Sequence, residues 1–313
     1  MPTKIPTGDW LRSKLDRLTK MTNLVSTEYP EEVSEPDYGF WSIKKEIALM
    51  YWIWPFLQIA PKYFDEFYYI DLFAGSGLMK ADDVSFVGSP IVAIGSTLPD
   101  KKFSQYICLE IDANRKRVLE KRAAVACKFF GTCDAKIFQS DCNIELDRIL
   151  REYCPSEETC FLAFVDPQKI TDFKWTTFHK LLTHGKGDVI LNFPTTQILR
   201  NLKIPESKNA LDGYFGDSLW SQVEPSSEAI LEYLLHKISL HRSEVDSLPV
   251  RDEQNRLLYD LIFATDSRGM RNVLSDLKTR LNRIKTKNIR GLYSVVTGDQ
   301  RQLTGFLEEK KGN

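Results

Sequence analysis

The feature of this chain that most constrains its fold is a regular alternation of apolar strand patterns and helical patterns between residues 67 and 193. Short segments rich in Ile, Val, Phe and Tyr recur along this stretch, and a helical pattern separates each one from the next. Parallel strands need long crossover connections, so this alternation predicts a parallel sheet with helices on both faces. The expected strands are residues 67–73, 105–112, 135–141, 159–167 and 188–193.

The pattern changes after residue 193. Residues 195–242 are mainly helical and predict a helical insertion, and residues 247–265 predict an antiparallel hairpin at one edge of the sheet. A helix with a regular apolar stripe follows over residues 269–284. An α/β, doubly wound (Rossmann-like), mostly parallel seven-stranded sheet with such an edge hairpin is typical of class I S-adenosylmethionine (SAM)-dependent methyltransferases. A shared fold does not by itself determine function.

The region before the alternation predicts two further helices. Residues 1–38 are expected to form an N-terminal helix, over residues 8–20, and a polar, proline-containing linker. Residues 41–60 predict a strongly apolar helix that breaks near Pro55, because proline lacks the amide hydrogen that a helix interior needs. The methyltransferase-like domain is then expected to cover residues 39–298, and residues 299–313 to form a C-terminal tail.

Composition restricts the classes of function. Lys and Arg number 42 against 43 Asp and Glu, so the net charge of −1 gives no overall attraction to nucleic acid or acidic membranes. The longest apolar run, residues 47–59, is too short to span a bilayer, and the first 20 residues lack the apolar core of a signal peptide. The 6 cysteines form no CxxC pair, and no histidine has a partner at metal-ligand spacing. We therefore expect a cytoplasmic protein with reduced cysteines, no membrane segment and no metal site.

The first strand runs directly into a glycine-rich turn, DLFAGSG, at residues 71–77. Ligands of open α/β sheets bind beyond the carboxyl ends of the strands, and glycines let a ligand approach the backbone. The acid at the start of the turn disfavours a phosphate but suits the methionine ammonium of SAM, which it can hold by a charge-assisted hydrogen bond. The candidate cofactor contacts in this turn are Asp71, Phe73, Ala74, Gly75 and Gly77.

Acids also end the next two strands of the pattern. Glu110, with Asp112 as the less favoured alternative, ends the second strand, where a carboxylate can accept hydrogen bonds from both ribose hydroxyls of a nucleotide. Asp141 ends the third strand, where it would face the adenine amino group. Three acids at three successive strand ends predict SAM or a close relative as cofactor. The alternative is a structural turn flanked by solvated acids.

The fourth strand ends in DPQK, residues 166–169. Methyltransferases that act on exocyclic amino groups carry (D/N)PP(Y/F) here: the polar side chain accepts hydrogen bonds from the target amino group, and the ring stacks on the base. The chain keeps the first two positions, so Asp166 and Pro167 are the candidate catalytic residues. It departs at the next two, and the ring would have to come from Phe173 or Trp175. The alternative is an Asp-Pro pair that merely ends a strand.

Several motifs of the chain, in order over residues 39–285, resemble the three-Cys-motif partner proteins, prokaryotic proteins similar to SAM-dependent methyltransferases. These motifs are WSIK at 41–44, YIDLFAG at 69–75, GSP at 88–90, Glu110, Asp166-Pro167 with Trp175, residues 188–193 with Arg200, YFG at 214–216 with Trp220, residues 259–265 and Gly269-Met270. The resemblance implies a methyltransferase-like fold and a separate protein partner that carries the three cysteines. It does not imply a known substrate. The family usually has an aromatic residue and a glycine after the Asp-Pro pair, and Gln168-Lys169 departs from both. The positions that the resemblance adds as candidate substrate contacts are Lys44, Trp175, Asn192 and Arg200.

Two further features predict binding surfaces. Residues 268–290 hold eight basic residues against one acid, which indicates either a solvated helix face or a surface for a nucleic-acid backbone. The candidate nucleic-acid contacts are Arg271, Lys278, Arg280 and Lys285. The tail has a spacing similar to peptides that dock on a sliding clamp (PCNA), and the alternative is a segment packed on the chain's own core. Its candidate partner contacts are Gln300, Leu303, Phe306 and Leu307.

Two functional hypotheses follow from the sequence. The first is a SAM-dependent methyltransferase that acts on an amino group, most readily that of a nucleic-acid base. The second is a catalytically silent, methyltransferase-like scaffold in a DNA replication, repair or defence complex, which would bind through the tail or the basic helix.

Overall fold

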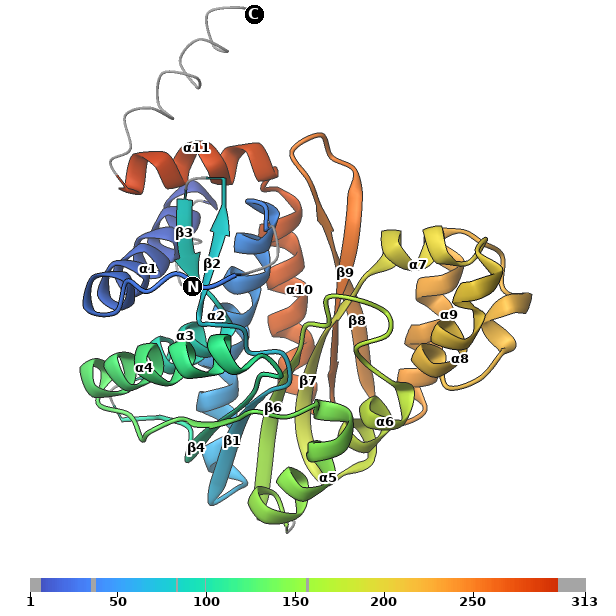
Figure 1. Cartoon of the computed structure of the whole chain (residues 1–313), viewed down its shortest axis with the longest axis horizontal. Helices are drawn as coiled ribbons and strands as arrows, with labels where there is room; N and C mark the ends of the chain where they lie inside the picture. The colour runs from blue at the N-terminus through green and yellow to red at the C-terminus, as the bar shows by residue number, and fades with distance from the viewer. Residues whose placement is uncertain (1–6, 35–37, 83, 99, 156–157, 298–313) are drawn as a thin grey trace, which may run out of the picture.

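The centre of the molecule is a seven-stranded sheet with the strand order β5-β4-β1-β6-β7-β9-β8 (Figure 1). The structure is a computed structural model and describes residues 7–34, 38–82, 84–98, 100–155 and 158–297. The strands are β1 (Glu66–Asp71), β4 (Gln105–Leu109), β5 (Lys136–Phe138), β6 (Thr159–Val165), β7 (Lys186–Phe193), β8 (Glu244–Arg251) and β9 (Leu257–Thr265). Strands β5, β4, β1, β6 and β7 run parallel, whereas β9 is antiparallel to both β7 and β8. The predicted doubly wound sheet with an antiparallel edge hairpin, the class I methyltransferase fold, is confirmed.

Strand residues alternate between two cores, as the period of two in a strand requires. Tyr69, Leu162 and Ile190 belong to the core on one face of the sheet, and Ile70 and Val189 belong to the core on the other. The inner strands β4, β1, β6, β7 and β9 are largely buried on both faces, which explains their nearly continuous apolar sequences, whereas the edge strands β5 and β8 are more exposed.

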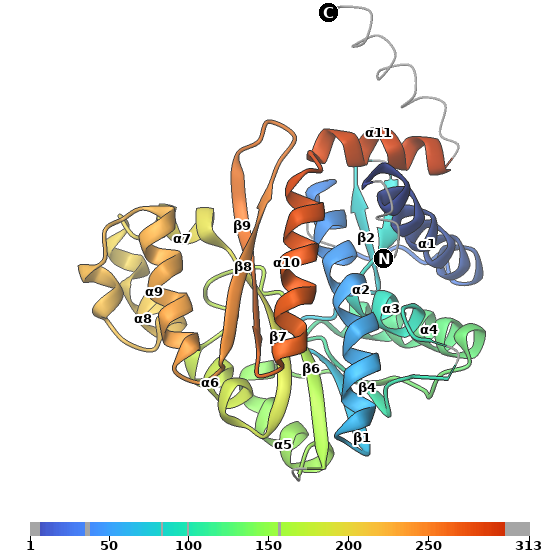
Figure 2. The same cartoon turned by 180° about the vertical axis from the view of Figure 1, so that it is seen from behind.

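Helices form a layer on each face of the sheet. The first face carries α1 (Thr7–Glu28), α2 (Trp41–Ile59), α3 (Ser89–Gly95), α4 (Ala113–Phe130), α10 (Arg268–Asn282) and α11 (Thr286–Thr297). Figure 2 shows α2 and α10 side by side on this face. The second face carries α5 (Cys142–Tyr153), α6 (Trp175–Thr183), α7 (Thr195–Asn201), α8 (Lys208–Phe215) and α9 (Ser227–Ser239). Among the described residues, no helix is both long and apolar enough to cross a bilayer.

Local features differ from the sequence predictions, among them the unpredicted helix α11 and the short strand β5. Helix α1 continues to Glu28, because Met21 and Val25 extend its buried stripe. Helix α2 passes through Pro55 without a break: proline costs it one backbone hydrogen bond, but buried neighbours such as Trp52 and Leu57 hold it against the sheet. A small antiparallel hairpin, β2 (Leu78–Ala81) and β3 (Val84–Val87), stands between the glycine-rich turn and α3.

Candidate functional site

A cavity of about 370 Å³ lies at the carboxyl ends of β1, β4, β5 and β6, where a doubly wound sheet binds its ligands. Its volume falls within the range of small-molecule sites. The predicted residues that line it are Phe73, Gly75, Glu110 and Asp141. The glycine-rich turn and two of the three predicted acids therefore meet at one cavity.

The two glycines of the turn both have left-handed backbones, with φ of 61° at Gly75 and 84° at Gly77. Gly75 lines the cavity, and its amide donates to Glu110 Oε2 at 2.9 Å. Gly77 faces inwards, because a Cβ there would lie 3.0 Å from Leu119 Cδ1 and 3.1 Å from Ile91 Cγ1. Gly75 therefore leaves room for a ligand, whereas Gly77 leaves room for the helices behind the turn.

Asp71 does not line the cavity, because its side chain is 0% exposed beneath the turn. It accepts hydrogen bonds from the Tyr69 hydroxyl at 2.9 Å and from the Phe73 amide at 3.2 Å. Burial raises the pKa of Asp71 to about 6. The buried Ala74 ties the same turn to β4 through its amide, which donates to the Leu109 carbonyl at 2.9 Å. The buried Asp71 thus holds the turn in place, and its side chain does not reach the cavity.

Glu110 and Asp141 are the predicted acids at the cavity, which Asp172 also lines. Glu110 Oε1 accepts from the Asp112 amide at 2.8 Å and from Arg115 Nη2 at 2.9 Å. Asp112 itself caps α4, which separates its role from that of Glu110. Asp141 caps α5 through Oδ1, which accepts from the Asn143 amide at 2.8 Å, while Oδ2 bonds to no residue that the structure describes. Both carboxylates retain capacity to accept hydrogen bonds from a ligand.

Tyr29 and Glu31, which follow α1, are held to the glycine-rich turn through Arg122, a contact that the sequence did not reveal. The buried Arg122 donates to the Ser76 carbonyl at 3.0 Å and hydroxyl at 2.8 Å, and also to the carbonyls of Tyr29 and Glu31. Tyr38 lines the cavity. One arginine of α4 therefore couples the turn to the residues that follow α1.

A buried polar cluster lies on the neighbouring strand ends. Asp166 follows β6, and its Oδ1 accepts from Asn192 Nδ2 of β7 at 2.6 Å. Its Oδ2 pairs with the ammonium of Lys45 from α2, and both side chains are almost completely buried. Burial alone would lower the pKa of Lys45, but the carboxyls of Asp166 and Glu46 beside it raise that pKa. Pro167, next in the chain, is also buried. The structure thus joins two predicted residues, Asp166 and Asn192, to a lysine that the sequence analysis missed.

Three polar atoms around this cluster have no hydrogen-bond partner within the described part of the chain: Glu46 Oε2, Asn192 Oδ1 and the Tyr259 hydroxyl. Glu46 is 1% exposed, and burial raises its pKa to about 8, so its carboxyl is mostly uncharged at pH 7. The cluster therefore combines one ion pair, one neutral acid and several unfilled hydrogen-bonding positions.

The adjacent Lys44, the predicted substrate contact, is buried on α2 but makes no ion pair with a described residue. Burial, followed by the charge of Arg251, lowers its pKa to about 8. The signal that would have found Lys45 and Glu46 is the sequence KKE inside an otherwise apolar helix, because such a helix can bury charge only against partners.

The predicted stacking rings take part in packing. Phe173 is buried, with its ring 5.9 Å from that of Phe73. Trp175 lies under α8 and α9: the Lys237 ammonium is 4.3 Å from its ring, and a Cβ on Gly216 would come within 2.2 Å of it. Arg200 is exposed on α7 and, like Trp175, does not line the cavity. Gln168, which follows the Asp-Pro pair, is exposed and borders the cavity.

Most of the predicted nucleic-acid contacts are already paired with acids. The pairs are Arg271 with Glu244 at 2.6 Å, Lys278 with Asp246 at 2.6 Å and Arg280 with Asp276 at 2.7 Å. Strand β8 supplies two of these acids from outside the basic run, which reduces the positive charge of the helix surface. Lys285 is exposed. The tail contacts predicted at Gln300, Leu303, Phe306 and Leu307 lie outside the described residues.

Comparisons with known proteins identify no family for the chain. No family model matches it, and no curated protein matches it. An O-methyltransferase from Bacillus cereus in complex with SAH is similar in structure, with a TM-score of 0.40 and 10% identity over 81% of this chain and 90% of that chain. The ribosomal protein L11 methylase of Lactobacillus delbrueckii subsp. bulgaricus has a TM-score of 0.35 and 13% identity over 71% of this chain and 78% of that chain. These likenesses concern the fold alone, and the fold assignment rests on the strand order of the sheet.

Proposed function

We propose that this chain binds SAM in the cavity at the carboxyl edge of the sheet. The observation that carries the proposal is that Gly75, Glu110 and Asp141, from three successive strand ends, surround this one cavity. Glu110 would accept from the ribose hydroxyls in competition with Arg115, and Asp141 Oδ2 would accept from the adenine amino group. The other predicted turn residues would shape the site; these are Asp71, Phe73, Ala74 and Gly77.

The bound cofactor would supply an activated methyl group, and we propose an amino group, most readily that of a nucleic-acid base, as the acceptor. Asp166 and Pro167 would position it, since a carboxylate at this strand end can accept hydrogen bonds from an amino group. A target amino group would then have to share Asp166 Oδ2 with the Lys45 ammonium or replace it. Asn192 would keep the carboxylate oriented through its hydrogen bond to Oδ1.

The second candidate is a methyltransferase-like scaffold without catalysis. Both oxygens of Asp166 are engaged, and the rings of Phe173 and Trp175 pack within the protein, which favours this alternative. The chain would then act as a three-Cys-motif partner protein, and its protein partner would be the three-Cys protein or a sliding clamp. Lys285 and the neighbouring basic residues would contact nucleic acid. The free cysteines, five of which are buried, are compatible with a cytoplasmic location.

Calorimetric titration of SAM and S-adenosylhomocysteine tests the cofactor proposal. We expect micromolar binding to the wild type and at least about tenfold weaker binding to Glu110→Gln, because a charged acceptor is lost. Asp112→Asn is the matched control: it lies two residues away, and asparagine caps a helix as well as aspartate does. Equal affinity of Glu110→Gln and Asp112→Asn, or no binding to the wild type, would contradict the proposal.

Transfer of a radiolabelled methyl group from SAM to DNA, RNA and protein fractions separates the two candidates. The enzyme proposal expects label in a nucleic-acid fraction with the wild type and much less with Asp166→Asn, at unchanged SAM affinity. Binding of SAM without transfer to any fraction would favour the scaffold.

A further inference from the structure

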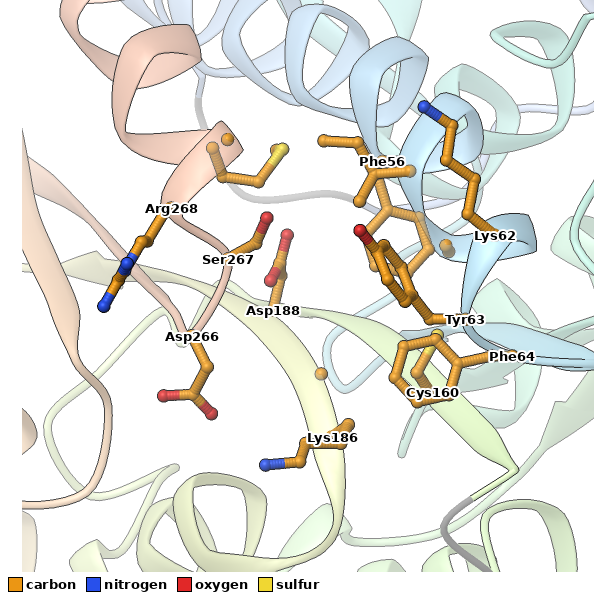
Figure 3. A pocket seen from close by; sticks show the side chains of 15 residues that line it. Phe56, Lys62, Tyr63, Phe64, Cys160, Lys186, Asp188, Asp266, Ser267 and Arg268 are labelled. Atoms are coloured by element: carbon orange, nitrogen blue, oxygen red, sulfur yellow. The ribbon is translucent and has the colours of Figure 1, made fainter.

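A second and larger cavity, of about 610 Å³, lies at the opposite edge of the sheet from the candidate cofactor site (Figure 3). It is bordered by the end of α2 and the 3₁₀ turn after it (Ala60–Lys62), by the amino ends of β6 and β7, and by the turn between β9 and α10. Every residue that lines it is among those described. It shares no residue with the candidate cofactor cavity, so it requires an explanation of its own.

One wall of this cavity is aromatic and apolar. Phe56, Tyr63 and Phe64 contribute rings from the end of α2 and the segment after it, and Met270 contributes from α10. Tyr63 is 73% exposed, so a large ring lies open to solvent at a cavity. Figure 3 shows the Tyr63 and Phe64 rings on one side of the cavity and Asp188 nearer its centre. Aromatic faces carry negative electrostatic potential and attract cations.

Asp188 supplies a buried carboxylate at the same cavity. Its side chain accepts from Trp52 Nε1 at 2.9 Å, and the Thr265 hydroxyl provides a second hydrogen bond. Burial raises the pKa of Asp188 to about 6, so the carboxylate is still mostly ionised at pH 7. Arg242 acts on this pKa from a distance, but its guanidinium pairs with Asp266 at 2.7 Å. Asp188 therefore carries a buried charge that makes no ion pair with any residue in the described ranges.

The other charged side chains at the cavity are those of Lys62, Lys186, Asp266 and Arg268. Figure 3 shows Arg268 on the other side of Asp188 from Tyr63, Lys186 below Asp188, and Lys62 above Tyr63 with its ammonium directed away from the ring. All three cations are exposed to solvent, which screens their effect on the interior. Cys160 adds no charge, because burial raises the pKa of its thiol. The space between the rings and Asp188 is thus a place where a cation would gain both an aromatic and a carboxylate contact.

We propose that this cavity binds a small organic ammonium ion, of the choline type, with its cationic head between the rings of Tyr63 and Phe64 and the carboxylate of Asp188. A quaternary ammonium fits better than a metal ion, because its methyl groups pack on aromatic carbon and it requires little desolvation. The carboxylate balances its charge. The site is separate from the proposed cofactor site and does not depend on SAM binding.

Titration of choline chloride, at constant ionic strength, into protein labelled with ¹⁵N tests the proposal. The reporter is the indole N–H signal of Trp52, which donates to Asp188 and is assigned with the variant Trp52→Phe. We expect a saturable shift in the wild type, a dissociation constant about fivefold higher in Tyr63→Ala and at least about tenfold higher in Asp188→Asn.

Phe129→Ala is the matched control, because Phe129 is a similarly exposed ring, 68% accessible, on the distant helix α4. It should bind choline as the wild type does. Tyr63 is exposed, so Tyr63→Ala keeps the test valid even if Asp188→Asn fails to fold. The proposal would be overturned by the absence of a saturable shift, by equal affinity of Tyr63→Ala and Phe129→Ala, or by potassium acetate shifting the signal in place of choline.

Discussion

Helix α2 contacts one buried carboxylate at each edge of the sheet, and it gives the two different partners. At the carboxyl edge, Lys45 places an ammonium on Asp166. Seven residues further on, about 10 Å along the helix axis, Trp52 gives Asp188 only an indole hydrogen bond. Both carboxylates are less than one-tenth exposed: 7% for Asp166 and 6% for Asp188.

The difference shows which of the two buried carboxylates has a cation from the same chain beside it. A buried carboxylate is costly to ionise unless a cation or several hydrogen bonds accompany it. Asp166 has its cation within the fold, so an external amino group has to compete for it. Asp188 has no such cation among the described residues, and it lies at a cavity. The carboxyl edge thus holds a buried carboxylate with its counter-charge beside a cofactor-sized cavity, whereas the opposite edge holds a buried carboxylate without an ion pair in the described ranges.

The largest effect is expected for Lys45→Met. This variant leaves Asp166 as a buried charge without its partner, and such losses lower the free energy of unfolding by about 3 to 5 kcal/mol. The double variant Lys45→Met/Asp166→Asn should recover most of that loss, because no unpaired charge remains. Urea unfolding of the two single variants and the double variant measures the coupling.

Lys44→Met is the control for Lys45→Met, since it changes a buried lysine at the next position of the same helix. Burial lowers the pKa of Lys44 to about 8, so methionine should be tolerated within about 1 kcal/mol. Equal destabilisation by the two methionine variants would show that Lys45 matters for packing and not for the charge of Asp166. Additive effects in the double variant would lead to the same conclusion.

An effect that develops only as the pH is raised is expected for Glu46→Gln. The pKa of Glu46 is about 8 in the folded protein and 4.5 for the ordinary carboxyl. Between these values the folded state holds one more proton than the unfolded state, so stability falls as pH rises, by up to about 1.4 kcal/mol per pH unit. Glutamine removes this loss, so the variant should match the wild type near pH 4.5 and exceed it by pH 8.

Asp188→Asn extends this comparison to the other edge. The pKa of Asp188 is about 6 against an ordinary 3.8. Stability therefore again falls as the pH rises, but over a lower and narrower range of pH. The free energy of unfolding of Asp188→Asn, plotted against pH, should therefore diverge from that of the wild type between pH 4 and 6 and run parallel to it above pH 6. Urea unfolding across this pH range checks both variants. Parallel curves for Glu46→Gln and the wild type throughout would mean that Glu46 is ionised when folded.

The sequence was sufficient for the sheet because its signals are local. Each strand carries its own apolar pattern, and each helix its own period, so the order of elements could be predicted without knowing any contact. The hairpin of β2 and β3 was missed because four-residue strands with charged residues between them do not differ from a loop in sequence. The continuous α2 was missed because packing, which the sequence does not display, outweighed the local effect of Pro55.

The site was less predictable because it depends on orientation and on distant partners. Asp71 is the last residue of β1 and Glu110 directly follows β4, yet Asp71 is buried beneath the glycine-rich turn and Glu110 faces the cavity. Lys45 and Asp166 are separated by 121 residues, and the choice between Lys44 and Lys45 depends on the rotation of α2. A pattern along the chain predicts which strand ends meet, but not which side chains point to the ligand.

The smallest effect is expected for Lys278→Met, which tests whether burial and not pairing itself sets the importance of Lys45. Lys278 pairs with Asp246 at 2.6 Å, but the two side chains are 29% and 48% exposed. Water and salt screen such a pair, so its loss should lower the free energy of unfolding by less than about 1 kcal/mol.

The salt dependence of the stability loss distinguishes Lys278→Met from Lys45→Met further. Raising the salt concentration to about 1 M shortens the screening length to about 3 Å, so the difference between Lys278→Met and the wild type should vanish. The loss in Lys45→Met should persist, because its ion pair lies where salt does not penetrate. A loss in Lys278→Met as large and as insensitive to salt as that in Lys45→Met would break the comparison, since a partly exposed pair would then stabilise the fold as much as a buried one.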